Sequence, residues 1–256
     1  MEETYKEAVK KRYDGEKSDE EALLLNVYSL MNPVGRYGLY NTYKVLSWFV
    51  RLVMNSRNKS LMELSFLDAG CGKGLMTRIL KELTYSDEVY GFDLSRPRIE
   101  VCKKLNDSIH YGVGDISDDF RSFDRCFDGI LAFDVFMFLR TEENIFKALR
   151  NISNALCEGG LFLWYDINAK SHFDKCDCDS IGYSCREMDE FANRVGLELY
   201  AYSNLYKNIS VFNKSRSTFY LVELLGDCLT EILNYLYPGT PTINIRVYRK
   251  CDSMLN

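Results

Sequence analysis

From residue 64 onwards, short apolar runs alternate with longer segments in which apolar residues recur every three or four positions. Apolar runs of about four to eight residues are typical of buried strands, and the longer spacing is typical of amphipathic helices. The expected strands are residues 64–67, 88–92, 109–113, 127–133, 161–167, 197–205 and 243–248. Helical spacing is found between them at residues 75–83, 141–156 and 184–195. The alternation predicts a doubly wound α/β fold whose mostly parallel sheet is covered by helices on both faces.

Residues 1–60 precede this alternation and have helical patterns, so we expect them to form an N-terminal helical cap or lid. Ser18 followed by Glu21 has the spacing of a capping box, which predicts the start of one helix. Asn32-Pro33 together with Gly35 and Gly38 predicts a break, after which a second helix follows.

Residues 61–256 are expected to form the core domain, with one interruption near its end. A long apolar helix at about 219–236 is stopped by Pro238-Gly239 and separates the last two expected strands. We therefore expect a helical insertion at about 207–241. Its wide apolar stripe suits either a pocket wall or the interface of a homodimer.

Composition adds expectations about partners and location. The chain of 256 residues has a formal net charge of −5, which argues against nucleic acid as its main partner because phosphate binding needs a concentrated basic surface. No apolar segment approaches the length of a membrane span. Nine cysteines without a secretory leader predict free thiols in a reducing cytoplasm.

The segment after the first expected strand has the pattern D-x-G-x-G-x-G, formed by Asp68, Gly70, Gly72 and Gly74. Glycines let the backbone turn tightly and approach a ligand closely. The dinucleotide fingerprint G-x-G-x-x-G needs a third glycine where this chain has Leu75. A carboxylate at the start of the loop would repel a pyrophosphate and attract a positively charged amino group. The pattern therefore indicates S-adenosylmethionine, which carries an ammonium and a sulfonium and no phosphate.

Two further acids follow the next expected strands. Asp93 lies about twenty residues beyond the glycines, at the position from which a carboxylate accepts hydrogen bonds from ribose hydroxyls. Asp115 follows the third strand. Because the carboxyl ends of parallel strands meet at one edge of a sheet, all the acids are expected at the ligand-binding edge. Taken singly, each acid is also explained as a solvated loop carboxylate or a helix cap.

In this order the motifs resemble those of the class I S-adenosylmethionine-dependent methyltransferases. The resemblance covers roughly residues 62–200 and the last strand, and its specific part is the glycine loop followed by Asp93 at the correct spacing. Its pieces are the glycine loop Asp68–Gly74, the ribose acid Asp93, the adenine-binding turn Gly114-Asp115-Ile116, the fourth strand Phe127–Phe133 and the turn Leu156–Gly160, where Glu158 replaces the usual proline.

The resemblance implies a seven-stranded sheet with an antiparallel last strand, and an enzyme that converts S-adenosylmethionine to S-adenosylhomocysteine. It implies that Asp68 and Gly70 hold the methionine end of the cofactor and that Asp93 holds the ribose. Asp115 and Ile116 would hold the adenine. The whole implied cofactor-binding set is Asp68, Gly70, Cys71, Gly72, Gly74, Asp93, Leu94, Asp115, Ile116 and Phe133.

Methyl transfer is an in-line displacement, and a hydroxyl acceptor normally also needs a base. Many small-molecule members of the family carry histidines after the fourth strand, but residues 134–139 contain none. The catalytic candidates are Asp134 after the fourth strand, Asp166 at the end of the fifth, and His172 in the loop beyond. Histidine titrates near neutral pH, which suits a base. The other histidine, His110, falls inside a strand and is expected to be structural.

Potential zinc ligands gather after the fifth strand at His172, Cys176, Cys178 and Cys185. Zinc sites usually pair their cysteines with two to four residues between them, whereas this segment has a Cys-x-Cys step. We therefore expect unligated thiols and no metal.

An aromatic segment before the core supplies candidate acceptor contacts. In the resembled family, N-terminal helices often cover the cofactor and build the acceptor site. Arg36 would meet a carboxylate or phosphate, and Tyr37, Tyr40 and Tyr43 would contact the sulfonium or the substrate. Packing of these tyrosines in the core is the alternative.

These observations together predict a methyltransferase that acts on a small-molecule acceptor, such as a sugar or another metabolite, at oxygen or nitrogen. The N/D-P-P-Y/F motif of nucleic-acid amino methyltransferases is absent after the fourth strand, where the chain reads Asp134-Val135-Phe136-Met137. The alternatives are an RNA or protein methyltransferase and a non-catalytic module that binds the cofactor.

Overall fold

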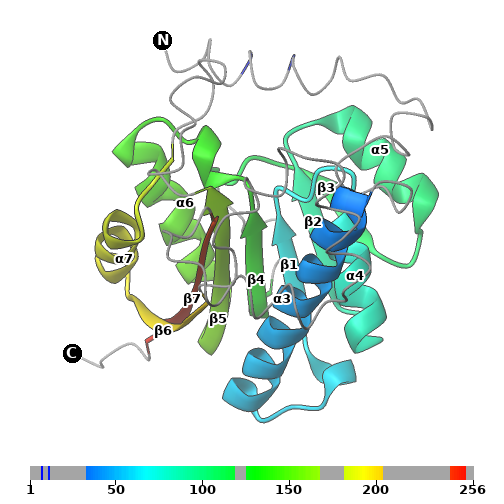
Figure 1. The fold of residues 1–256 in the computed structure, drawn as a ribbon, viewed down its shortest axis with the longest axis horizontal. Coiled ribbons are helices and arrows are strands. Elements are labelled where there is room, and N and C mark those ends of the chain that lie inside the picture. The colour runs from blue at the N-terminus through cyan, green and yellow to red at the C-terminus, as the bar shows by residue number, and fades with distance from the viewer. Residues whose placement is uncertain are drawn as a thin grey trace.

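A computed structural model describes residues 7, 11, 33–118, 125–167, 182–203 and 243–251 of the chain (Figure 1). Its seven strands are β1 (Phe66–Ala69), β2 (Val89–Asp93), β3 (His110–Val113), β4 (Phe127–Phe133), β5 (Leu156–Ile167), β6 (Leu197–Ser203) and β7 (Ile243–Lys250). Its helices are α3 (Pro33–Arg57), α4 (Leu75–Thr84), α5 (Arg96–Leu105), α6 (Glu142–Ala155) and α7 (Cys185–Asn193), with short 3-10 turns η1 (Leu61–Glu63) and η3 (Phe136–Phe138). The helix expected after Ser18 and the insertion expected at 207–241 lie outside the described residues.

The strands form one sheet in the order β3-β2-β1-β4-β5-β7-β6. β1 pairs in parallel with both β2 and β4, whereas β7 runs antiparallel to its neighbours β5 and β6. The predicted mostly parallel, seven-stranded sheet with an antiparallel last strand is therefore confirmed. The strand order reverses at β1, from which the chain first builds outwards to β3 and then returns to place β4 on the other side. Ligands of open α/β sheets bind at the carboxyl ends of the strands beside such a reversal.

Two hydrophobic clusters hold the helices on the sheet. One cluster lies between the sheet and α3, α4 and α5, and the other lies between the opposite face and α6 and α7 (Figure 1). The covering of both faces explains why the central strand β4 is buried along its whole length and reads as a continuous apolar run in the sequence. No helix in the described part of the chain is long and apolar enough to cross a membrane.

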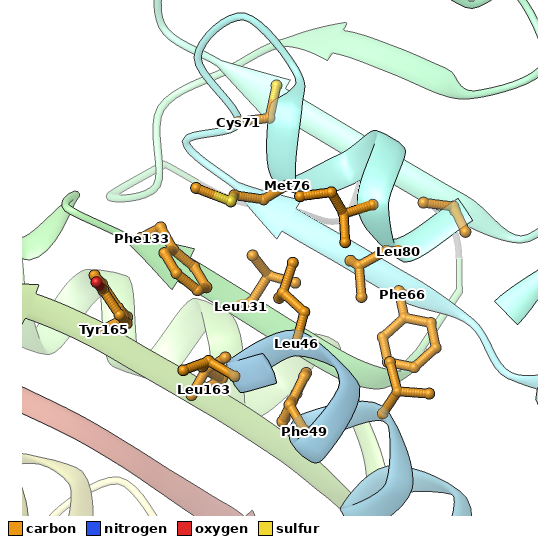
Figure 2. Packing of buried hydrophobic residues seen from close by; sticks show 14 of the residues in the cluster. Leu46, Phe49, Phe66, Cys71, Met76, Leu80, Leu131, Phe133, Leu163 and Tyr165 are labelled. Carbon is orange, nitrogen blue, oxygen red and sulfur yellow. The ribbon is translucent and has the colours of Figure 1, made fainter. Parts of the chain in front are cut away.

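The helix α3 packs against one face of the sheet. Leu46 and Phe49 are fully buried, and the Phe49 ring meets the Phe66 ring of β1 edge-on with a centroid distance of 6.2 Å (Figure 2). The helix begins at Pro33, within the break predicted at Asn32-Pro33, but the extension of that break to Gly35 and Gly38 is wrong, because both glycines lie inside α3. A glycine inside a helix costs only about 1 kcal/mol relative to alanine, which packing of the apolar face offsets.

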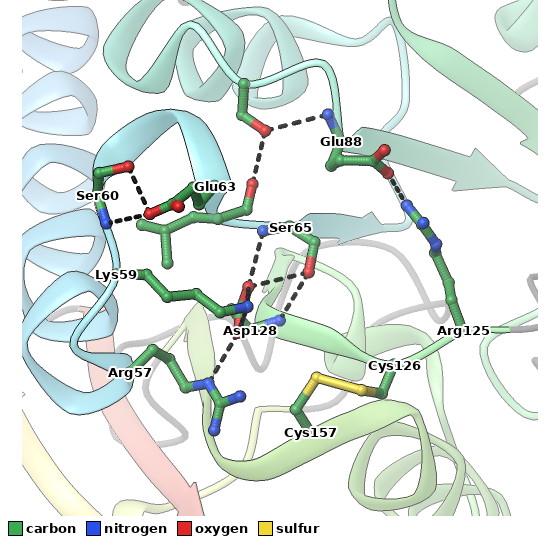
Figure 3. Close-up of polar contacts among 12 residues, drawn as sticks. Arg57, Lys59, Ser60, Glu63, Ser65, Glu88, Arg125, Cys126, Asp128 and Cys157 are labelled. Carbon is green, nitrogen blue, oxygen red and sulfur yellow. Dashed lines mark hydrogen bonds and ion pairs between the residues drawn. A yellow bond between two sulfur atoms is a disulfide. The ribbon is translucent and has the colours of Figure 1, made fainter.

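A buried carboxylate, Asp128 at the start of β4, ties the end of α3 to the sheet (Figure 3). It accepts hydrogen bonds from Arg57 Nε at 2.7 Å, from Lys59 Nζ at 2.9 Å and from the backbone N–H of Ser65 at 3.0 Å. Burial alone would raise the pKa of Asp128, but these hydrogen bonds and charges outweigh it and lower the pKa below its usual value.

Replacing Asp128 by asparagine is expected to lower the free energy of unfolding by about 1–2 kcal/mol, because two cations lose their counter-charge while the shape is kept. Urea unfolding measures this difference. The matched control is Asp87→Asn, which removes an exposed partner of Lys81 and is expected to change the free energy of unfolding much less than Asp128→Asn does. Equal losses in the two variants would contradict a special role for the buried carboxylate.

One pair of cysteines departs from the expectation of free thiols. Cys126 and Cys157 form a disulfide, with a Cα–Cα distance of 5.0 Å (Figure 3). The pairing follows from the sheet register, because Phe127 of β4 lies opposite Leu156 of β5. The spacing of apolar residues along the chain does not predict how β4 and β5 are aligned, so it could not show that two cysteines 31 positions apart would pair. The other cysteines in the described segments, Cys71, Cys102, Cys185 and Cys251, are free.

Candidate active site

The carboxyl edge of the sheet collects the residues that the sequence assigned to the cofactor. They follow the ends of four adjacent strands: Asp68 and Gly70, Cys71, Gly72 and Gly74 at β1, Asp93 and Leu94 at β2, Asp115 and Ile116 after β3, and Phe133 at the end of β4. Segments far apart in the chain are thus brought to one place by the parallel register (Figure 1).

The glycine loop is a tight turn pressed against its surroundings. Gly70 has φ +82° and its N–H donates to the carbonyl of Phe92 at 2.8 Å. A Cβ at this position would lie 2.5 Å from Cγ2 of Val135, so any other residue would both strain the backbone and clash. Gly74 has φ +76° at the start of α4, where a Cβ would meet the Tyr111 hydroxyl at 2.7 Å. Glycine at position 70 lets the loop lie directly on the segment after β4, and glycine at position 74 lets it lie against Tyr111 of β3.

Asp93 fixes the loop from the neighbouring strand. Its Oδ2 accepts the backbone N–H of Gly72 at 2.9 Å, and its Oδ1 accepts the backbone N–H of Ser95 at 2.9 Å. The carboxylate is only partly buried, so its remaining lone pairs lie within reach of a ligand at the sheet edge. One side chain therefore holds both the glycine loop and the turn that follows β2.

Asp68 lies beneath the loop with 1% of its surface exposed. Its Oδ2 accepts the Thr77 hydroxyl at 2.6 Å, whereas its buried Oδ1 has no hydrogen-bond partner among the described residues. Burial raises the pKa of Asp68 to about 7, against the lowering effect of the Thr77 hydrogen bond. An unpaired buried carboxylate oxygen is costly, and a ligand ammonium would satisfy it. This orphaned atom fits the amino end of S-adenosylmethionine.

The turn after β3 is closed by its own side chains. Asp115 Oδ1 accepts both the backbone N–H and the hydroxyl of Ser117, at 2.8 and 2.7 Å. The N–H of Asp118 donates to the carbonyl of Asp115 at 3.0 Å. The Ile116 side chain is buried, and the Asn151 amide of α6 donates to the carbonyl of Ile116. The turn is therefore a preformed structure that can present Asp115 and Ile116 to a ligand.

Asp134 ends β4 in a strained conformation. Its φ is +53°, in the left-handed region that costs a non-glycine residue free energy, and its N–H donates to the carbonyl of Tyr165 at 2.9 Å. Burial raises the pKa of Asp134 to about 6. Because the next residue, Val135, packs against Gly70, this carboxylate follows directly on the contact with the glycine loop.

Asp166 ends β5 beside Asp134 and is also buried. Its Oδ2 accepts the backbone N–H of Met137 at 2.9 Å, which holds η3 against β5. The Phe133 and Tyr165 rings stack beside this turn with centroids 4.2 Å apart (Figure 2). Asp166 is therefore bonded to the backbone of the segment after β4.

The tyrosines assigned to the lid lie on α3. Tyr43 donates its hydroxyl to Glu82 Oε2 at 2.7 Å, and Tyr40 is 39% exposed with Lys44 Nζ 5.3 Å from its ring centroid. Both line a cavity of about 540 Å³ that Trp48 and Tyr202 also border. The backbones of Arg36 and Tyr37 belong to α3, while their side chains lie outside the described part.

The loop histidine and two cysteines expected near the site, His172, Cys176 and Cys178, lie outside the described residues. Cys185 is described, and its thiol donates to Asn244 Oδ1 at 3.0 Å. Across the described segments, no three His, Cys, Asp or Glu side chains gather as metal ligands. His110 lies in β3, where its ring stacks on Tyr90 at 4.5 Å.

Three side chains shape the site without having been expected from the sequence. Thr77 binds Asp68, Val135 covers Gly70, and Asn151 binds the turn after β3. Each of the three side chains contacts a residue of another element, so no local sequence motif predicts the contact.

Comparison with known proteins agrees with this geometry. A family model described as a methyltransferase domain matches residues 67–164, which run from β1 into the second half of β5. No curated protein sequence matches the chain.

Several solved structures share the fold. A TehB-like S-adenosylmethionine-dependent methyltransferase from Corynebacterium glutamicum is 23% identical, with a TM-score of 0.53 over 79% of this chain and 86% of the other. Magnesium protoporphyrin IX methyltransferase from Synechocystis, with S-adenosylmethionine bound, is 10% identical, with a TM-score of 0.62 over 96% and 97%. A sugar N-methyltransferase from Streptoalloteichus is 13% identical, with a TM-score of 0.57 over 81% and 87%. At these identities the likeness is one of fold.

Proposed function

The chain carries a methyltransferase domain of the class I, S-adenosylmethionine-dependent kind, and from this premise we propose that it methylates a small-molecule acceptor at oxygen or nitrogen. The observation that carries the proposal is Asp134, a strained and partly buried carboxylate that follows β4 next to the glycine loop. Strained residues held in place by the surrounding fold cluster at active sites.

We propose that three carboxylates and one backbone group of this chain bind the cofactor. Bound S-adenosylmethionine supplies a methyl group on a sulfonium. Asp68 Oδ1 would pair with the ammonium, and Asp93 would accept hydrogen bonds from the ribose hydroxyls. Asp115 and the backbone of Ile116 would meet the adenine edge. These contacts would hold the cofactor at the carboxyl edge of the sheet beside the segment after β4, and alignment of the reacting groups there would supply much of the rate acceleration.

Asp134 is proposed to orient the acceptor and to take its proton. When bound, S-adenosylmethionine would supply the methyl group and leave as S-adenosylhomocysteine. The Asp134 carboxylate would accept the proton that the acceptor oxygen or nitrogen gives up on methylation. Asp166 would position this segment through Met137, and His172 remains a candidate base outside the described residues.

A small acceptor is favoured over a macromolecule by charge and motif. The net charge is −5, and the segment after β4 lacks the N/D-P-P-Y/F pattern of nucleic-acid amino methyltransferases. Tyr40 and Tyr43 border a cavity of about 540 Å³, but none of the candidate cofactor-binding residues lines it, so it does not bear on the acceptor. The sugar N-methyltransferase with the same fold acts on a small molecule, and we extend that class of acceptor to this chain.

Two other functions have different requirements. An RNA or protein methyltransferase would need a docking surface, and one structural neighbour, from Haloferax volcanii, was solved with a methyltransferase activator. A non-catalytic module would bind the cofactor without transferring its methyl group. Calorimetric titration with S-adenosylmethionine and S-adenosylhomocysteine, followed by methyl-transfer assays on sugars, amines, RNA and protein, separates the three. Transfer to RNA or protein alone, or cofactor binding without any transfer, would overturn the proposal.

The location proposed is the cytoplasm. Four cysteines of the described segments are free, in keeping with a reducing compartment, whereas the bridge between Cys126 and Cys157 counts against it. We also propose a homodimer through the helix expected at about 219–236, which sedimentation equilibrium tests.

Replacing Asp134 by asparagine is expected to lower turnover about tenfold and to leave S-adenosylhomocysteine affinity within about twofold, because the lost charge acts on the acceptor. In the wild type, turnover should rise as the pH passes about 6, since burial raises the pKa of Asp134 to about 6 and the ionised form is needed. Steady-state assays across pH measure both effects. Asp107→Asn, at an exposed carboxylate, is the control. An acidic limb near pH 6 that survives in Asp134→Asn would assign it to another group.

A further inference from the structure

Asn151 reaches from α6 to the turn that follows β3. Its side-chain Nδ2 donates to two backbone carbonyls of that turn, the carbonyl of Ile116 at 3.2 Å and the carbonyl of Asp118. The residue is partly buried on the sheet side of α6, and both hydrogens of one amide are used on a single short segment.

The bonds from Asn151 complement those that the turn makes within itself. Inside the turn, the N–H groups of Ser117 and Asp118 are the donors, and Asp115 supplies the acceptors. The carbonyls of Ile116 and Asp118 point outward to α6 and receive the Asn151 amide. Internal bonds fix the shape of the turn, whereas the amide fixes its place relative to the sheet.

We propose that Asn151 is a positioning residue for adenine recognition, which holds the turn at the place where Asp115 and Ile116 can read the adenine edge. The proposal rests on the cofactor and on the adenine role of this turn, and not on the identity of the acceptor. It adds to the proposed function a residue on α6, from the helix layer opposite to the one that carries the glycine loop and α5.

Hydrogen bonding to adenine requires the turn after β3 to be placed accurately. Adenine presents a 6-amino donor, which a carboxylate such as Asp115 accepts, beside a ring nitrogen that a backbone N–H can meet. Hydrogen bonds weaken steeply when their distance or angle departs from the optimum. A turn released from α6 would therefore lose discrimination for the amino group before it lost affinity for the ribose and methionine parts of the ligand.

The test compares two ligands in one variant. Calorimetry would measure the affinities of S-adenosylhomocysteine and of S-inosylhomocysteine, in which oxygen replaces the adenine amino group. We expect the wild type to prefer the adenosyl ligand. In Asn151→Leu, which keeps a similar volume and has no donors, adenosyl affinity should fall about five- to tenfold while inosyl affinity changes less than about twofold. Asn151→Gln, which keeps an amide, should recover part of the preference.

The matched control is Asn154→Leu, an exposed asparagine on the same helix, which should leave both affinities unchanged. Should Asn151→Leu fail to fold, Asn151→Asp removes the same two donors at constant shape and is measured in its place. If Asn151→Leu loses the same affinity for both ligands, Asn151 has only a structural role. If the wild type binds both ligands equally well, the turn does not recognise the adenine amino group. Either result overturns the inference. Neither ligand carries a methyl group to transfer, so an incorrect acceptor class leaves this test unaffected.

Discussion

Replacing Asp93 by alanine is expected to weaken S-adenosylmethionine binding about 100-fold, which corresponds to ~2.7 kcal/mol. Hydrogen bonds to a charged group are worth about 1.5–3 kcal/mol, and the ribose would lose its charged acceptor. The same change releases the backbone N–H groups of Gly72 and Ser95, which Asp93 holds at 2.9 Å each. The loss therefore combines a missing ligand contact with a loosened glycine loop, and isothermal titration measures the sum.

Two further variants separate these contributions. Asp93→Asn keeps one acceptor oxygen, so it should bind the cofactor more tightly than Asp93→Ala and more weakly than the wild type. Asp107→Ala changes an exposed carboxylate after α5 and should have no effect. Thermal unfolding in the absence of ligand checks that each variant is folded. Unchanged affinity in a folded Asp93→Ala protein would remove the ribose assignment.

The elements best predicted from the sequence are those whose burial is uniform. β4 was expected at residues 127–133 and is found there, because both of its faces are covered and every position is apolar or glycine apart from the buried Asp128. β5 begins five residues before its expected start at Leu161, because Leu156 already pairs with Phe127. That extension depends on the neighbouring strand, which a pattern along one chain does not contain.

The helix α5 was not among the expected helices. Only Ile99 and Cys102 are buried within it, so its apolar stripe is narrow, and Pro97 lies in its first turn. Proline is favoured at that place in a helix, but it reads as a breaker in an isolated sequence. The sequence did not predict that the helix continues through Gly35 or that Cys126 forms a disulfide, because both depend on contacts with distant strands.

The candidate site was predictable where its chemistry follows directly on a strand. The glycine loop and Asp93 can be identified in the sequence because glycine and carboxylate residues interrupt apolar runs at a fixed spacing. Thr77 and Asn151 carry no such signal, because threonine and asparagine on a helix are ordinary surface residues until the helix is placed. Their partners lie 9 and 35 positions away, and the parallel sheet decides which of these separations becomes a contact.

Cofactor affinity is expected to depend on pH through Asp68. Burial raises the pKa of Asp68 to about 7, although the Thr77 hydrogen bond lowers it, so the carboxyl group of the free protein is largely protonated below that pH. Pairing with a ligand ammonium requires the ionised form, and binding at lower pH must release the proton. Affinity should therefore fall about tenfold for each pH unit below about 7, since one pKa unit corresponds to ~1.36 kcal/mol. At higher pH it should level off until the ligand amine itself loses its proton.

Calorimetry in two buffers of different ionisation enthalpy measures the proton release directly, and nearly one proton per ligand is expected at pH 6. Asp68→Asn should bind weakly at all pH values and show no slope between about pH 5.5 and 7.5. Thr77→Val removes the hydroxyl that lowers the pKa of Asp68, so the slope should extend to higher pH. Burial raises the pKa of Tyr111, and a hydrogen bond with Cys102 raises that of Cys71, so neither neighbour titrates in this range. A slope that persists in Asp68→Asn would come from another group, such as Asp134 with its pKa of about 6, or from the ligand, and the buried carboxylate would then not be the partner of the ammonium.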